Sequence, residues 1–593
     1  MKRWITCLLA AGLVLSMLSA CGAKTGEKPK RPLKEVAVDA VSFTDLATDN
    51  ACYGAARYAV AAGIMEAGDG AFRPEAAATR GEAALAVWQL CGAPAGKGKT
   101  RFSDAKDDPA ASWCDEHGIL ADIPGTVFDA GAPVTRQELM MMLHRTAVHL
   151  GYEAEAAGDL SAYVDGHKVK DADAVAWAVE KNIYPGLVKD TRLQPGIALS
   201  RLQLACSMVA FAALETADEA ACAAAATLPA PMESQAKANH EAIARVIETI
   251  AKKNGAAGVQ VAVVEKGVLT DTFTYGWATK ETDPMTPDHV IRLASISKIG
   301  IGLSAMFLQE EGVVELDQDM SQYWGFTVRN PKHPDRPITI RHMLTHTSSI
   351  VNAPTETSRL YDDVCLNLQG EGFTRGIPGD IGYWSYNNYG YGVLGMTLEL
   401  ASDRHIDEIL DQHLYRYADM TAAFAPGDLP QGTKLTNVYQ ANGTIGRSVE
   451  LQQSMHVDPK PGGNGEFFAG VMTTSASDAA KMAVLLANDG LYEGVRLLEA
   501  SSVEQMETVN PTAVPAGFYQ GLTIRYRPNL YGRENIYYHT GSAYGVYNCF
   551  SYDPDTGDGI VVLTTGAAGN KDAYGIYEIC AAINNHFYRL VAE

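Results

Sequence analysis

The stretch LASISKIG, residues 293–300, places Ser295 three residues before Lys298. A serine hydroxyl is almost un-ionised at neutral pH, so it becomes a nucleophile only when a neighbouring group takes its proton. A lysine three residues further along a helix lies on the same face, with about 5–6 Å between the two Cβ atoms. The stretch therefore predicts a serine nucleophile beside a lysine that manages its proton.

The Ser-x-x-Lys spacing also occurs at residues 103–106 and 234–237, so the spacing alone is weak evidence. The surrounding sequence separates the three cases. Residues 259–278, VQVAVVEKGVLTDTFTYGWA, predict a β-hairpin ahead of Ser295, and KIGIGLSAMFLQEEG predicts a strongly apolar helix directly after it. The other two pairs lie in an opening loop and beside a Pro-containing linker. We therefore take Ser295 as the candidate nucleophile.

Two further motifs follow along the chain. Tyr386 and Asn388 form a Tyr-x-Asn motif; a tyrosine beside cations can act as a proton shuttle or base, and an amide can hold a substrate carbonyl. His539, Thr540 and Gly541 lie on a predicted strand near the C-terminus. Glycine at that position lets a substrate backbone lie close to the strand edge.

Taken in order, Ser-x-x-Lys, Tyr-x-Asn and His-Thr-Gly resemble the motifs of the serine β-lactamase and penicillin-binding protein superfamily. The branch that is most similar contains class C β-lactamases, D-Ala-D-Ala carboxypeptidases and related esterases. The resemblance covers residues 236–593 and includes ITIRHMLTHTSSI at 338–350. It implies an α/β domain of the β-lactamase/transpeptidase type, with an antiparallel sheet flanked by helices and a helical insertion.

The resemblance also implies roles for individual residues. Ser295 would attack a carbonyl and form an acyl-enzyme, and Lys298 and Tyr386 would manage its proton, with either of them as the general base. The oxyanion hole would be formed by the backbone N–H groups of Ser295 and Ser542. The residues expected to bind the substrate or the oxyanion are Asn388, His539, Thr540, Gly541 and Ser542.

His539 stands where class C β-lactamases usually carry lysine, whereas several D,D-carboxypeptidases, aminopeptidases and esterases carry histidine. The leading interpretation is therefore a serine hydrolase of the penicillin-binding D,D-carboxypeptidase, D-aminopeptidase or esterase type. One alternative is a class C-like β-lactamase, and another is a wall-binding or penicillin-sensing protein without turnover. No metal or organic cofactor is implied, and His342 and His346, four residues apart, are interpreted as structural because no third ligand is evident.

Three related segments precede this domain, at residues 41–95, 100–151 and 160–214, and a linker is expected at 215–235. Each opens with aromatic-x-Asp and re-enters a helix at a Thr-Arg or Ser-Arg pair, so repeats of short helices are predicted. The segments resemble S-layer homology (SLH) repeats, which bind secondary polymers of bacterial cell walls and would form an all-α module. The resemblance implies that Arg80, Arg136 and Arg201 contact the polymer. The third repeat departs from the pattern, with Gln203 in place of the usual acid.

The N-terminus predicts export. Positive residues, a short apolar run and a small-residue stretch ending at Cys21 resemble a bacterial lipoprotein signal at residues 1–20, with Cys21 as the lipidated residue. Residues 21–40 are expected to be a flexible tether. A net charge of −22 argues against nucleic acid as a partner. The expected location is therefore extracytoplasmic, with a lipid in the membrane, SLH repeats on the wall, and a peptidoglycan-derived peptide, ester or β-lactam as substrate.

Overall fold

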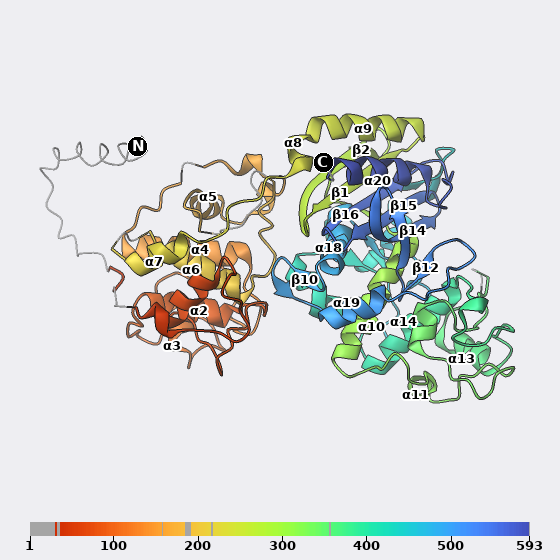
Figure 1. The fold of residues 1–593 in the computed structure, drawn as a ribbon, viewed down its shortest axis with the longest axis horizontal. Coiled ribbons are helices and arrows are strands. Elements are labelled where there is room, and N and C mark those ends of the chain that lie inside the picture. Colours follow the sequence, from red (N-terminus) through yellow and green to blue (C-terminus); the bar gives the residue numbers. More distant parts are fainter. Residues whose placement is uncertain are drawn as a thin grey trace, which may run out of the picture.

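The computed structural model describes residues 30–32, 36–156, 158–183, 191–214, 217–354 and 357–591. The described chain forms a helical N-terminal module and a larger domain built on a β-sheet (Figure 1). The predicted signal peptide and Cys21 lie outside the described residues. Within the described part, no helix combines the length and the apolar character needed to cross a bilayer.

The N-terminal module contains the helices of the three repeats. Thr79 and Thr135 cap α2 and α4 with capping boxes closed by Glu82 and Glu138, as predicted. Ser200 and Gln203 form the same box at α6. The helices are α1 (Tyr53–Ala61), α2 (Arg80–Leu90), α3 (Pro109–Glu116), α4 (Arg136–Leu150), α5 (Ala172–Glu180) and α6 (Arg201–Ala212).

The three repeats meet where the chain enters α2, α4 and α6. Isolated antiparallel bridges join these entry segments in a ring: Ala77 to Ser200, Thr79 to Pro133, and Thr135 to Ala198. The described module is therefore helical apart from short bridges. The bridges bring the three arginines at the helix starts to one side of the module.

The predicted tether and the predicted linker are partly packed against this module. Arg31, in the predicted tether, is only 7% exposed and forms a 2.8 Å ion pair with Asp218. Helix α7 (Glu219–Ala225) lies in the predicted linker, and its Ala221 is fully buried. An Ala-rich helix face and a buried ion pair thus hold these residues against the module.

The second domain is organised around an antiparallel eight-stranded sheet in the order β12-β13-β14-β15-β16-β1-β2-β3. The predicted N-terminal hairpin is β1–β2, and the predicted C-terminal pair is β15–β16, so strands from both ends of the domain lie in one sheet. The strands are β1 (Gly258–Glu265), β2 (Val268–Thr279), β3 (Asp283–Pro284), β12 (Tyr519–Gln520), β13 (Arg525–Leu530), β14 (Arg533–Ala543), β15 (Val546–Asp553) and β16 (Asp558–Thr565).

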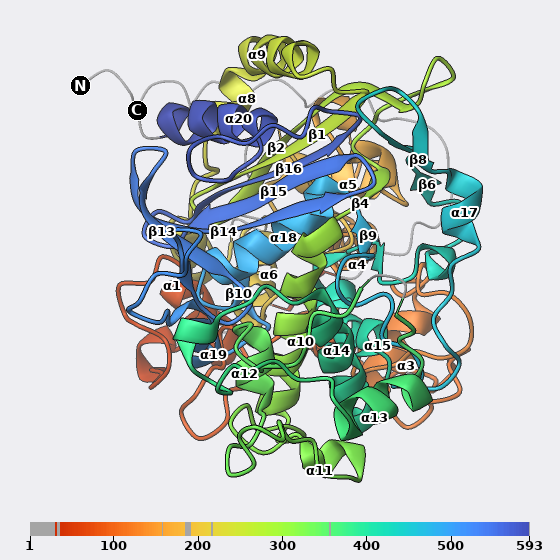
Figure 2. The same ribbon diagram turned by 90° about the vertical axis from the view of Figure 1, so that its right-hand side faces the viewer.

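Helices cover both faces of the sheet (Figure 2). Helices α9 (His240–Lys253) and α20 (Glu578–Leu590) pack on one face, and α18 (Ala476–Ala487) packs on the other. The helical insertion lies beyond α18 and includes α10 (Ser297–Glu310) and α14 (Asn388–Ser402). The predicted fold class, an antiparallel sheet flanked by helices with a helical insertion, is confirmed.

Shorter elements complete the described domain. The remaining helices are α8 (Gln235–Ala238), α11 (Ser321–Trp324), α12 (Ile340–Leu344), α13 (Tyr361–Gln369), α15 (Ile406–Leu410), α16 (Arg416–Ala418), α17 (Val449–Gln453) and α19 (Ala500–Glu507). The remaining strands are β4 (His289–Arg292), β5 (Ala422–Ala423), β6 (Lys434–Leu435), β7 (Val438–Tyr439), β8 (Ile445–Arg447), β9 (Thr473–Thr474), β10 (Leu491–Tyr492) and β11 (Val495–Arg496).

Candidate active site

Ser295 lies in a tight turn between β4 and α10. The turn is a 3₁₀ segment, Ala294–Ile296, and Ala294 has a φ of 52°, a left-handed conformation that is uncommon for a residue with a Cβ atom. The Ser297 hydroxyl donates to the Ala294 carbonyl at 2.6 Å and holds the turn. Ser295 is half-buried, whereas the residues on both sides of it are buried. The fold therefore presents this hydroxyl alone at the surface of the turn.

Lys298 is fully buried beneath the serine. Its ammonium donates to Ser295 Oγ at 3.3 Å, Asn388 Oδ1 at 2.9 Å and the Ala469 carbonyl at 2.6 Å. Burial lowers the pKa of Lys298, because desolvation penalises the charged form. The three acceptors use all three N–H groups of the ammonium. Lys298 therefore holds Ser295 and Asn388 in fixed positions around one cation.

Tyr386 lies between two cations. The Lys298 Nζ is 5.0 Å from the centre of its ring, and the Arg525 guanidinium carbon is 5.4 Å from it. Burial acts to raise the pKa of Tyr386, but the charges of Lys298 and Arg525 outweigh burial and bring the pKa below its ordinary value. The buried hydroxyl makes no hydrogen bond of standard geometry. Its lone pairs are therefore free to accept a hydrogen bond, and the flanking cations favour its phenolate form, which can accept a proton.

His346 packs directly against this tyrosine, with 4.5 Å between the two ring centres. Its Nδ1 accepts from the backbone N–H of Asn387 at 3.1 Å, and the Asn387 side chain donates to the Ile350 carbonyl at 2.7 Å. Burial, then the charge of Lys298, holds the pKa of His346 well below its usual range, so the ring is neutral. The sequence predicted a structural role for His346. Its hydrogen bond to Asn387 fixes the loop that carries Tyr386.

A cavity of about 370 Å³ opens above Ser295. The predicted residues Tyr386, Asn388, Thr540 and Ser542 line it together with Ser295. The structure thus brings together residues that are far apart in the sequence. The other lining residues are Trp384, Ala516, Phe518, Arg525, Tyr538, Lys571, Tyr574, Gly575 and Tyr577.

Arg525 is a cavity residue that the sequence motifs did not identify. It lies on β13, and its Nη1 donates to Thr540 Oγ1 at 3.1 Å. Its guanidinium also stacks over Phe518, with 4.7 Å between the guanidinium carbon and the ring centre. The guanidinium therefore supplies positive charge on the β14 side of the cavity. No sequence motif marks Arg525, because only the pairing of β13 with β14 reveals Thr540 as its neighbour.

His539 is not among the residues that line the cavity, and its ring centre lies 6.4 Å from that of Tyr386. Tyr538, Thr540 and Ser542 line the cavity, so the strand alternation turns His539 to the other face of β14. The His539 side chain is fully buried, and its Nδ1 contacts the Thr540 carbonyl at 2.9 Å. Burial and the charge of Arg525 hold its pKa well below the usual range. A neutral histidine occupies this position.

Gly541 lies against the nucleophile turn. A Cβ atom at this position would be 2.2 Å from the backbone carbonyl oxygen of Leu293, which belongs to that turn. Asn548 on the neighbouring strand donates to the Arg292 carbonyl at 3.0 Å. Strands β14 and β15 therefore support the turn that carries Ser295.

The predicted wall-binding arginines, Arg80, Arg136 and Arg201, lie in the N-terminal module, at the starts of α2, α4 and α6. Each forms an ion pair with a carboxylate. Among the residues that the structure describes, no group of three or more His, Cys, Asp or Glu side chains could hold a metal ion.

Comparisons with known proteins agree with this architecture. The β-lactamase family model matches residues 243–579, and the S-layer homology domain model matches residues 42–84. Penicillin-binding protein 4* of Bacillus subtilis is 25% identical over 203 residues, covering 33% of this chain and 40% of that protein. Penicillin-binding protein 4 of Amycolatopsis lactamdurans is 24% identical over 299 residues, covering 48% of this chain and 75% of that protein.

Among solved structures, the D-amino acid amidase of Ochrobactrum anthropi is 20% identical, with a TM-score of 0.48, covering 60% of this chain and 98% of that one. The family model spans more than half of the 593 residues. The chain therefore belongs to the β-lactamase family, the β-lactamase-fold family of serine hydrolases, and carries an S-layer homology domain ahead of that fold.

Proposed function

We propose that this protein is a cell-surface serine hydrolase that forms an acyl-enzyme, of the penicillin-binding D,D-carboxypeptidase type. Ser295 attacks a substrate carbonyl, and its proton passes to the Tyr386 oxygen. Two observations support Tyr386 as the base: its pKa is lowered by two flanking cations, and all three donors of Lys298 are engaged. A protonated lysine that donates to Ser295 cannot take the serine proton at the same time.

The negative charge that develops on the carbonyl oxygen falls near the backbone N–H groups of Ser295 and Ser542. When the C–N bond breaks, Tyr386 returns the proton to the departing amine, and the acyl group stays on Ser295 Oγ. Water then releases it and restores the serine. Lys298 and Asn388 keep the serine and the substrate amide in place through their 2.9 Å hydrogen bond.

The observation that favours a carboxypeptidase is the pair of Arg525 and Thr540 in the cavity. A guanidinium and a hydroxyl 3.1 Å apart offer charge-assisted hydrogen bonds to a free carboxylate. A leaving D-amino acid at the end of a peptide carries such a carboxylate. An aminopeptidase substrate carries an ammonium group at its cleaved end instead, which this cation repels.

The remaining features support a location at the cell envelope. The S-layer homology match at residues 42–84 supports attachment to a wall polymer, with Arg80, Arg136 and Arg201 as its contacts. The predicted lipoprotein signal with Cys21 supports a lipid anchor in the membrane. Both features keep the hydrolase domain beside peptidoglycan, which carries peptides that end in D-alanine.

The test is the intact mass of the full chain, followed over time after benzylpenicillin is added, with Ser295→Ala as the control. We expect a long-lived adduct of the mass of the drug on the unmodified protein and none on the variant. A short-lived adduct with rapid consumption of the drug would instead identify a class C-like β-lactamase. A stable protein that forms no adduct and releases no D-alanine from D-Ala-D-Ala peptides would favour a wall-binding protein without turnover.

A further inference from the structure

The arginines of the three repeats follow a cyclic pairing rule. Arg80 of the first repeat donates to Glu138 of the second at 2.7 Å, and Arg201 of the third pairs with Glu82 of the first. In both pairs, the carboxylate belongs to the glutamate that closes the capping box of its own helix, Glu138 in α4 and Glu82 in α2. The rule requires that Arg136 of the second repeat pair with the corresponding residue of the third. That residue is Gln203, which has no charge.

The hydrolase domain supplies the missing acid. Glu493 accepts from Arg136 Nη2 at 2.9 Å, and the two side chains are only 10% and 5% exposed. Gln203 Nε2 donates to the backbone carbonyl of Glu493 at 2.5 Å. A glutamate at position 203 has no donor for that carbonyl and would place a second carboxylate beside Glu493. Gln203 therefore fits a site that is occupied by Glu493.

Glu493 lies at the tip of the β10–β11 hairpin, on the side of the hydrolase domain that faces the helical module (Figure 1). Glu493 and Gly494 have φ values of 49° and 85°, so two left-handed residues make the tight turn. Gly494 lies close under Gln203, because a Cβ atom there would be 3.0 Å from Gln203 Nε2. Arg496 adds a backbone hydrogen bond of 2.7 Å and an ion pair of 2.9 Å to Glu75 of the first repeat. The hairpin thus contacts all three repeats.

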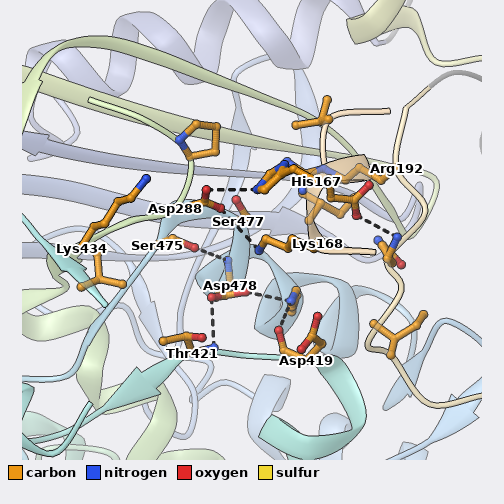
Figure 3. Close-up of a pocket in the computed structure, with 18 of the residues that line it drawn as sticks. His167, Lys168, Arg192, Asp288, Asp419, Thr421, Lys434, Ser475, Ser477 and Asp478 are labelled. Carbon is orange, nitrogen blue, oxygen red and sulfur yellow. Dashed lines mark hydrogen bonds and ion pairs between the residues drawn. The ribbon is translucent and has the colours of Figure 1, made fainter. Parts of the chain in front are cut away.

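Ion pairs also cross the interface beside the hairpin. A cavity of about 280 Å³ lies between the third repeat and the hydrolase domain (Figure 3). His167 and Lys168 point across it to Asp288, at 3.3 and 3.5 Å. Partly exposed ion pairs contribute little to stability and exchange readily with water or other ions. The buried Arg136–Glu493 pair is therefore the strongest charge contact at the hairpin, because its charges are largely withdrawn from water.

We propose that the β10–β11 hairpin is a built-in occupant of the Arg136 site, so that the hairpin and an anionic wall polymer exclude one another there. The inference rests on the proposed attachment of the repeats to a wall polymer. The Arg136 side chain is only 5% exposed between the module and the hairpin, so a second anion cannot reach its guanidinium. A polymer that binds Arg136 must first displace Glu493, and displacing a buried charge partner carries a large cost. The docked protein is therefore the weaker wall binder.

The test uses the full chain with three substitutions. Glu493→Arg places like charges together and is expected to undock the hairpin, and Arg136→Glu combined with Glu493→Arg restores an ion pair with the signs exchanged. Glu504→Gln is the matched control, because this exposed acid lies on α19 and makes no side-chain contact with the module. Small-angle X-ray scattering reports docking independently of any ligand.

Wall binding is then measured by co-sedimentation with sacculi from the organism that encodes the chain, before and after hydrofluoric acid removes the secondary polymer. We expect Glu493→Arg to increase the radius of gyration and to bind intact sacculi at least about tenfold more tightly than the unmodified protein. The swapped pair and Glu504→Gln should match the unmodified protein in scattering. Binding of every protein should fall on stripped sacculi.

Each other result contradicts a different step. Unchanged scattering for Glu493→Arg would show that this ion pair does not hold the hairpin. An undocked variant that binds walls no better than the unmodified protein would overturn the competition and leave wall attachment standing. No binding by any of the proteins, docked or undocked, would remove the proposed wall attachment itself, and the inference with it.

Discussion

The carbonyl oxygen of Leu293 lies 2.2 Å from the position that a Cβ atom on Gly541 would occupy. Because Leu293 is two residues before the nucleophile, Gly541→Ala must push the Ser295 turn away from β14. We expect a loss of about 1–3 kcal/mol in unfolding free energy and an acylation rate about 100-fold lower, since small misplacements of a reacting group are costly. Urea unfolding and penicillin acylation kinetics measure the two effects. Gly68→Ala, at a glycine with open space around it, should change neither.

The pH dependence of acylation distinguishes the two candidate bases. Tyr386 accepts a proton only as phenolate, so the acylation rate should rise with pH and level off above its pKa, which the cations hold below the ordinary tyrosine value. Tyr386→Phe should lower the plateau by about 10²–10⁴-fold and remove this ionisation. Stopped-flow acylation between pH 5 and 10 reports both. If Tyr386→Phe keeps the original pH profile of acylation, Lys298 and not Tyr386 is the general base.

Recognition of a substrate carboxylate is predicted to depend on Arg525. Arg525→Gln should lower kcat/KM for a D-Ala-D-Ala peptide by about 10–150-fold, the range for one hydrogen bond to a charged group. The same peptide with a C-terminal amide should be affected much less, because it offers no negative charge and feels only the effect of Arg525 on the pKa of Tyr386. The rate of release of the terminal residue gives kcat/KM for both peptides. Arg527→Gln is the control, since Arg527 is on the same strand but does not line the cavity. If Arg525→Gln lowered kcat/KM equally for the peptide acid and the peptide amide, Arg525 would not be the residue that binds the carboxylate.

The contribution of Asp407 to stability is expected to fall as pH rises from about 4 to 7. Its carboxyl accepts from the Phe424 N–H at 2.9 Å and lies 3.3 Å from the Tyr415 hydroxyl, and burial raises its pKa to about 7. The folded state therefore keeps a proton that the unfolded chain loses near pH 4. Asp407→Asn should reduce the loss of unfolding free energy between pH 5 and 8. Urea titrations at both values measure it, and an unchanged difference would show that Asp407 is not the titrating group.

The part of the site that could be predicted consists of residues that lie close together in the sequence. Ser295 and Lys298 are one helical turn apart, and Tyr386 and Asn388 flank a helix cap, so short segments encode their geometry. The burial of His539 beside Tyr386 could not be read from the motif, because it depends on which side chains of β14 line the cavity. Arg525 was missed for a related reason: it reaches Thr540 only through the β13–β14 register, which pairs Arg525 with Tyr538.

In the two-part fold, too, local features could be predicted and contacts between distant segments could not. The sequence pattern of residues 259–278 predicted the β1–β2 hairpin, and the Thr-Arg pairs of the repeats predicted the starts of α2 and α4. The substitution of Gln203 was visible in the sequence as a departure from the repeat pattern. Its reason was not, because the compensating Glu493 is nearly three hundred residues away and belongs to a different domain.

Ile197 of the third repeat is 1% exposed and packs in the apolar core of the hydrolase domain, beside the backbone hydrogen bond from Ala198 to Tyr417 at 2.8 Å. A boundary drawn at residue 236 therefore cuts through a shared core. An excised catalytic fragment would expose an apolar socket and is expected to aggregate or melt earlier than the whole chain. In calorimetry, the intact protein should unfold with the two parts coupled, because the repeats cover part of the core of the enzyme that they carry.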